Sequence, residues 1–155
     1  QGEFYSTGGL GKRGLQIFDA NQMLDGKPQY ITFNGRIGGA VGSMKAQTGE
    51  TVRVFFGNGG VNLISSFHLI GEIFDTVYPE GSIGGAMFKN VQTTAVPAGG
   101  AAIAEFKLEV PGKFIFVDHA LARLDRGAWG TLEVDGAQNK DIFNGVIDTQ
   151  NNLGH

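Results

Sequence analysis

The chain has 155 residues, of which 41% are hydrophobic, and this is enough apolar surface for one packed domain with a tail at each end. Its net charge is −3 and Lys and Arg form no run, so neither a nucleic acid nor an acidic membrane surface is an expected partner. Cysteine is absent, which excludes disulfides, thiolate nucleophiles and metal centres built on a thiolate.

The chain is rich in glycine, with 26 Gly residues against 4 Pro, and it shows no Gly-X-Y period. This composition excludes collagen and favours many tight turns between short strands. No apolar stretch approaches the roughly 18–20 residues that span a bilayer, so no membrane span is expected.

Residues 1–27 are Gly-rich and poorly periodic, and they predict a linker or a wrapping arm. Within this arm, the segment from Asp19 to Asp25 predicts a short helix. Asp19 is a suitable N-cap, and Gly26 and Pro28 are typical of a helix end.

Residues 28–136 carry short apolar and β-branched runs separated by Gly, Pro or Asn, which predict one domain made of strands. The predicted strands are 30–33, 51–56, 66–70, 91–96, 102–106, 113–117 and 130–134. No helical pattern is long enough for a crossover, so the predicted fold class is all-β, an antiparallel Greek-key β-sandwich. The interval from Phe74 to Lys89 is predicted to be one long irregular loop. Residues 137–155 predict a polar C-terminal tail, and its last residue, His155, is expected to be disordered.

His119 ends an alternating strand, and the alternation places it on the face of Ile115 and Val117, opposite Asp118. A single histidine at a strand end is more often structural than functional. The functional interpretation is a metal ligand with most of its coordination sphere missing.

His68 lies in a second apolar strand, where it shares one face with Ile70 and is opposite Phe67 and Leu69. The structural interpretation is a core histidine that bonds a backbone carbonyl. Two such histidines suggest a shared site, but open zinc or copper sites usually take about three protein ligands. Any metal here therefore needs ligands from another chain or domain.

Other motifs are weaker. The cluster from Gly57 to Gly60 lacks the remaining elements of a phosphate-binding loop and predicts a turn. Ser65 and Ser66 lack a nucleophile-elbow context. The carboxylates near the two histidines have no spacing that indicates acid and base roles; they are Glu72, Asp75, Asp118 and Asp125.

Three segments together resemble the second cupredoxin domain of copper-containing nitrite reductase. They are Ser65–Asp75, Asn90–Gly100 and Phe116–Leu121, and their order and spacing match over roughly residues 1–145. The patterns SSFHxIGE and VDHxL favour this family over other multicopper oxidases. A multicopper oxidase half acting on phenols or metal ions would also need His-x-His pairs, and the sequence contains none.

The resemblance implies a cupredoxin-like fold and a role for each matching residue. His119 corresponds to the one type 2 copper ligand that the second domain donates. His68 corresponds to the catalytic histidine that relays a proton to bound nitrite, and Ile70 to the apolar residue that shapes the pocket. Thr93 and Gln92 correspond to the hydrogen-bonding support of His68.

The resemblance further implies an enzyme of denitrification that reduces nitrite to nitric oxide. The type 2 copper would be shared with a first cupredoxin domain, and the type 1 copper would lie only in that domain, which this sequence does not include. A homotrimer, a small redox protein as electron donor and a periplasmic or otherwise extracytoplasmic location are also implied. The isolated chain is expected to be inactive. The alternative is a copper-free structural or trimerisation module.

Overall fold

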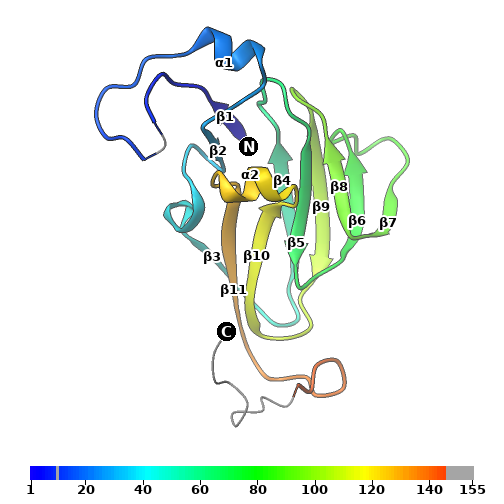
Figure 1. Ribbon diagram of the computed structural model, residues 1–155. Helices are drawn as coiled ribbons and strands as arrows, with labels where there is room; N and C mark the ends of the chain where they lie inside the picture. The colour runs from blue at the N-terminus through cyan, green and yellow to red at the C-terminus, as the bar shows by residue number, and fades with distance from the viewer. Residues whose placement is uncertain (10, 146–155) are drawn as a thin grey trace.

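A computed structural model of the protein describes residues 1–9 and 11–145 as a β-sandwich with two short α-helices (Figure 1). The elements are β1 (Gly2–Phe4), α1 (Ala20–Leu24), β2 (Tyr30–Thr32), a 3-10 turn η1 (Gly38–Val41), β3 (Ser43–Gln47), β4 (Thr51–Gly57), β5 (Ser65–Ile70), β6 (Phe74–Pro79), β7 (Phe88–Val91), β8 (Thr93–Val96), β9 (Ala101–Lys107), β10 (Gly112–Asp118), α2 (Leu121–Asp125) and β11 (Trp129–Asp135).

Two sheets form the sandwich, with strand orders β3-β11-β10-β5-β8 and β4-β9-β6-β7, and β1 pairs separately with β2. Most neighbours in the sheets are not consecutive in the chain, as Greek-key connections require. The predicted all-β sandwich is confirmed. One correction concerns strand direction, because the β3–β11 ladder is parallel whereas the other ladders are antiparallel.

Each predicted strand has a counterpart, although the predicted strand 91–96 is divided between the end of β7 and β8. The prediction of one irregular loop from Phe74 to Lys89 is wrong, because that interval begins with β6 and ends inside β7. In β6, Thr76 pairs with Glu105 of β9 on one side and with Lys89 of β7 on the other. Phe74, Thr76, Val77 and Tyr78 of β6 are residue types enriched in strands, and pairing on both sides fixes the segment as a strand.

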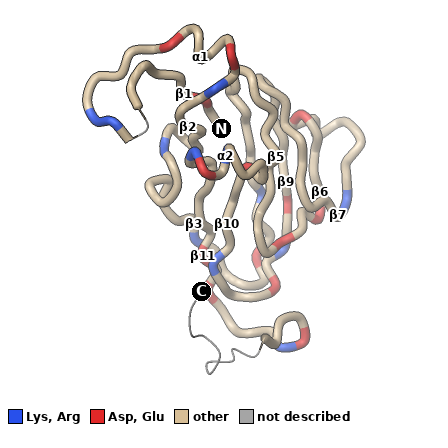
Figure 2. Tube along the Cα trace, viewed as in Figure 1, with Lys and Arg blue, Asp and Glu red and all other residues tan. Residues whose placement is uncertain are grey.

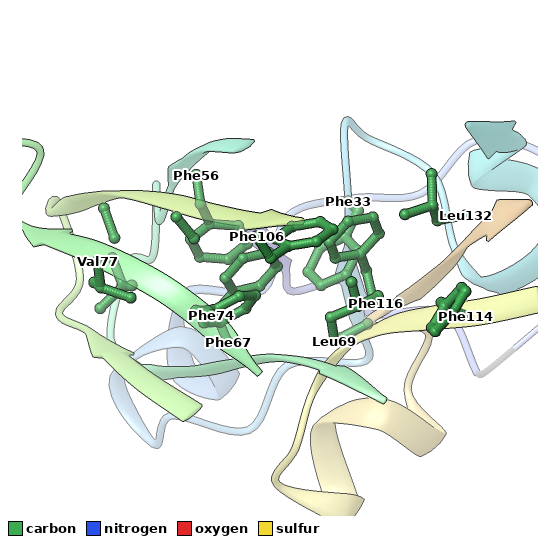
Figure 3. Close-up of a cluster of buried hydrophobic side chains, with 14 of the residues drawn as sticks. Phe33, Phe56, Phe67, Leu69, Phe74, Val77, Phe106, Phe114, Phe116 and Leu132 are labelled. Carbon is green, nitrogen blue, oxygen red and sulfur yellow. The ribbon is translucent and has the colours of Figure 1, made fainter. Parts of the chain in front are cut away.

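Phenylalanine rings fill the space between the two sheets (Figure 3). Phe67 of β5 is central, stacking on Phe56 with ring centroids 4.0 Å apart and lying 5.5 Å from Phe74 and 5.8 Å from Phe116. The inward positions of β5 and β10 are thus occupied by large aromatic groups. This packing turns the alternate residues of both strands, including His68, to the outer face of the five-stranded sheet.

The N-terminal arm passes over one end of the sandwich, above the strand ends in Figure 1. Helix α1 has the predicted cap, since Asp19 Oδ1 accepts hydrogen bonds from the main-chain nitrogens of Asn21 and Gln22 at 3.0 Å. Helix α2 packs against β10 at the same end of the sandwich. No helix in the described residues has the length and apolar character needed to cross a membrane.

Acidic and basic residues are interspersed along the chain in the view of Figure 2. The predicted tail 137–155 is described only as far as residue 145, so its remainder and His155 lie outside the described residues.

Candidate functional site

His68 lies in β5, between the edge strand β8 and β10 of the five-stranded sheet, opposite Thr93 of β8 and Val117 of β10. Its side chain is only 9% exposed. The ring Nδ1 lies 2.5 Å from the main-chain oxygen of Gln92. A carbonyl can only accept a hydrogen bond, so Nδ1 carries the proton and Nε2 remains the nitrogen available for proton exchange.

His119 is the first residue after β10, and its side chain is exposed. Its main-chain nitrogen donates to the oxygen of Ser66 at 2.8 Å, which continues the β5–β10 ladder past the end of the strand. The backbone of His119 is therefore fixed while its imidazole stays open to the surface.

The two imidazoles lie together, with ring centroids 5.1 Å apart and ring planes at 62°. Ile70 follows His68 on the same face of β5 and is 42% exposed, and Leu121 at the start of α2 is also exposed. The structure thus brings both predicted histidines and the predicted apolar residue to one face of the five-stranded sheet.

The two residues predicted to support His68 lie next to it. Gln92 contributes its main-chain carbonyl rather than its side chain. Thr93 is the cross-strand partner of His68, and its side chain is exposed on the same face. In the described residues the His68 ring bonds the Gln92 carbonyl and not the Thr93 hydroxyl.

Asp118 lies directly before His119 and is fully buried. Its carboxylate pairs with Arg123 of α2, with Nε and Oδ2 2.6 Å apart. This pair was not predicted from the sequence. The only local signal is a basic residue five positions after the acid, on the short helix that follows the strand.

A pocket of about 630 Å³ adjoins His68 on the side of the turn that follows β5. Its lining includes three carboxylates: Glu72, Asp75 and Glu109. Burial, together with the negative charges of Asp75 and Glu109, raises the pKa of Glu72 to about 7. A carboxyl group that titrates near neutral pH therefore lies in the pocket that His68 also lines.

Gly71 shapes the turn that leads to this pocket. Its φ of +103° is unfavourable for other residues, and a Cβ there would lie 2.7 Å from the Phe114 ring. Glycine is thus required to bring Glu72 back against the end of the sandwich.

The donor set of this chain fits part of a copper site. Imidazole nitrogens are good copper ligands, and His119 presents one at the surface. Within the described residues, no group of three or more His, Cys, Asp or Glu side chains could hold a metal ion. A complete site would therefore need donors from outside the described residues.

The fold and the paired histidines define a cupredoxin-like domain. No protein-family model matches the chain. The chain is 52% identical over 146 residues to the copper-containing nitrite reductase of Neisseria meningitidis serogroup A / serotype 4A (strain DSM 15465 / Z2491). That match covers 92% of this chain and 37% of the relative, so the chain spans little more than a third of that protein's length.

Solved structures agree. The copper-containing nitrite reductase of Thermus scotoductus SA-01 superposes with a TM-score of 0.74 at 25% identity, covering 86% of this chain and 29% of that one. The copper nitrite reductase of Nitrosomonas europaea gives a TM-score of 0.71 at 29% identity, covering 78% and 45%. The chain is thus a relative of copper-containing nitrite reductases that matches one portion of them, and the predicted resemblance is confirmed.

Proposed function

We propose that this chain is the second cupredoxin domain of a copper-containing nitrite reductase. In this proposal His119 donates one ligand to a type 2 copper, and a first domain from another chain or segment completes the site. The observation that carries the proposal is the pairing of an exposed imidazole, His119, with a buried and oriented one, His68, 5.1 Å away.

The proposed reaction converts nitrite, one electron and two protons to nitric oxide and water. Bound copper would supply the electron and polarise the nitrite oxygens. The electron would come from a type 1 copper in the first domain, which a small redox protein would reduce. No cysteine is present in this chain, so it cannot hold a centre based on a thiolate.

His68 would hold and deliver a proton at Nε2. The hydrogen bond from its Nδ1–H to the Gln92 carbonyl orients the ring, so Nε2 is the nitrogen that would donate a proton to nitrite. Histidine suits this role because it exchanges protons near neutral pH. Ile70 would form an apolar wall that limits the access of water, and Thr93 would support His68 from the neighbouring strand.

An exposed ligand residue also suggests how the assembly closes. If each subunit gives His119 to a site on its neighbour, the contact is heterologous and must form a ring to be finite. A homotrimer satisfies this condition. We further infer a periplasmic or otherwise extracytoplasmic location and a role in denitrification, both from similarity to the relatives above.

The test is to purify the assembly that contains this chain under native conditions and to measure intact masses, copper content and nitric oxide formed from nitrite. We expect a first domain to be present, and we expect the His119→Ala variant to lose both the copper bound through this chain and the activity. Since His119 is exposed, its removal should change stability by only about 0.5 kcal/mol. A copper-free oligomer of this chain alone, without activity, would instead support the structural-module alternative.

A further inference from the structure

Asp118 is a buried charge at the point where the chain leaves β10 for His119. It is the last residue of β10 and is 0% exposed. A buried carboxylate is unfavourable unless ionic and hydrogen-bonding partners surround it. The partners that this carboxylate has therefore indicate what it holds together.

One carboxylate oxygen joins two separate segments. Oδ1 accepts from the main-chain nitrogen of Ser66 in β5 and from that of Ala120, each at 3.2 Å. Ala120 is the N-cap of α2 and the residue directly after His119. The bond to Ala120 therefore closes a short loop around His119.

The other oxygen secures the helix. Oδ2 accepts from Arg123 Nε at 2.6 Å and from Gln1 Nε2 at 3.0 Å. Arg123 also reaches the Ser66 hydroxyl at 3.5 Å. The same side chain thus connects β5, β10 and α2.

The main chain of His119 lies inside this network. Its nitrogen donates to the Ser66 oxygen at 2.8 Å, and the nitrogen of Asp118 donates to the Ala128 oxygen at 2.9 Å. The residues on both sides of His119 are thus tied to one carboxylate. The imidazole itself is exposed, so its direction depends on the backbone that carries it.

We propose that Asp118, together with Arg123, is a positioning residue that fixes the backbone of His119 so that its imidazole is held ready to bind metal. The metal-binding part of this inference rests on the proposed function. The physical reason is preorganisation, because a ligand whose backbone is already rigid loses little freedom on coordination. Partners that orient a metal ligand typically account for about 10- to 100-fold in metal affinity.

The test compares Asp118→Asn with wild type in the complete assembly. Asparagine has the same shape, but one acceptor oxygen becomes an NH₂ group, so it cannot accept from Ser66, Ala120 and Arg123 together. We expect hydrogen exchange in the peptide that spans 117–123 to become about 10-fold faster, as its backbone opens more often. We expect copper retention against a chelator to fall about 10-fold and the copper electron paramagnetic resonance spectrum to change.

The matched control is Glu105→Gln. Glu105 also pairs with an arginine, Arg53, but on the other sheet. Its substitution should therefore change neither the hydrogen exchange of the 117–123 peptide nor the copper retention. If the Asp118→Asn variant does not fold, the Arg123→Gln variant takes its place, because it removes the ion pair but keeps the main-chain hydrogen bonds from Ser66 and Ala120 to Asp118. The Arg123→Lys variant should then recover part of the copper retention and of the protection from exchange that Arg123→Gln loses.

Each outcome of this experiment decides one of the two proposals. The positioning role would be overturned if the Asp118→Asn variant showed the same hydrogen exchange and the same copper retention as wild type. Where Asp118→Asn does not fold, the same result in the Arg123→Gln variant would overturn it. If the wild-type assembly holds no copper that depends on His119, the proposed function fails. The exchange rates of the 117–123 peptide then still decide whether Asp118 fixes this backbone.

Discussion

The two histidines of the site are held in opposite ways. His68 lies within a strand, is nearly buried, and is oriented through its ring by the Gln92 carbonyl. His119 lies beyond a strand end, has an exposed ring, and is fixed through its main chain by Ser66 and the network around Asp118. The first arrangement restricts an imidazole to one proton-exchanging nitrogen, whereas the second leaves an imidazole open to a partner.

In the proposed function, this difference suits the two histidines of one sheet to two different tasks. A residue inside a ladder has neighbours on both sides that can bond its side chain. A residue past the end of the ladder lacks such side-chain neighbours, so it is held through hydrogen bonds of its backbone. We expect the two histidines to respond differently to substitution for this reason.

The largest expected effect is the loss of catalytic rate in the His68→Asn variant. Asparagine cannot exchange a proton at the position of Nε2, so kcat for nitrite reduction by the assembly should fall by about 10²- to 10⁴-fold. Copper content should stay at the wild-type level, in contrast to His119→Ala. The measurement is kcat together with copper content, and loss of copper from the His68 variant would remove the distinction between the two histidines.

The next largest expected effect is on stability, and it concerns the aromatic core packing beneath both histidines. Phe67 is paired with Asp118 on one side and Thr94 on the other, and it stacks on Phe56. The Phe67→Ala variant should therefore lower the free energy of unfolding by about 3–5 kcal/mol, because it opens a cavity in the core. Urea denaturation measures this change.

The control for this prediction is Phe55→Ala. The Phe55 side chain is 73% exposed, so its removal should change the free energy of unfolding by only about 0.5 kcal/mol. Equal destabilisation by the two substitutions would show that the aromatic packing beneath the site is not what stabilises the sandwich.

The smallest predicted effect is a pH dependence at Glu72. The folded state raises the pKa of Glu72 to about 7 from its ordinary value of 4.5, because burial and the charges of Asp75 and Glu109 disfavour its ionised form. Between these two pH values the folded state binds more protons than the unfolded state, so stability falls as pH rises. The Glu72→Gln variant should not show this fall in stability with rising pH.

The measurement is the unfolding free energy of both proteins across this pH range. Above pH 7 the Glu72→Gln variant should be more stable by about 1 kcal/mol, a value reduced for the partial exposure of the group. Near pH 4 the two proteins should be equally stable. A difference that does not vary with pH would contradict the raised pKa.

Much of the sandwich could be predicted because its strands are marked locally. Alternation in β5 correctly placed Phe67 and His68 on opposite faces of the strand. Segments with weak propensity were missed. The strand β3 is largely polar, and its partner is β11, which is distant in the chain, so its strand conformation depends on a ladder that no local pattern reveals.

The positions of the candidate site residues were predictable to a similar extent. The motifs around His68 and His119 indicated both residues, but not that Gln92 acts through its carbonyl. The contact between Asp118 and Ser66 joins residues 52 positions apart. Its existence depends on strand register, which a side-chain pattern alone does not specify.

By itself the sequence determined which residues could face the core and which could face the site, because backbone alternation is a local property. It also excluded every centre that needs a thiolate. Only the tertiary structure decided that His68 and His119 lie 5.1 Å apart and that one buried carboxylate joins three elements beside them. These features arise from long-range pairing and packing, in which the partners of a residue are set by the whole sheet.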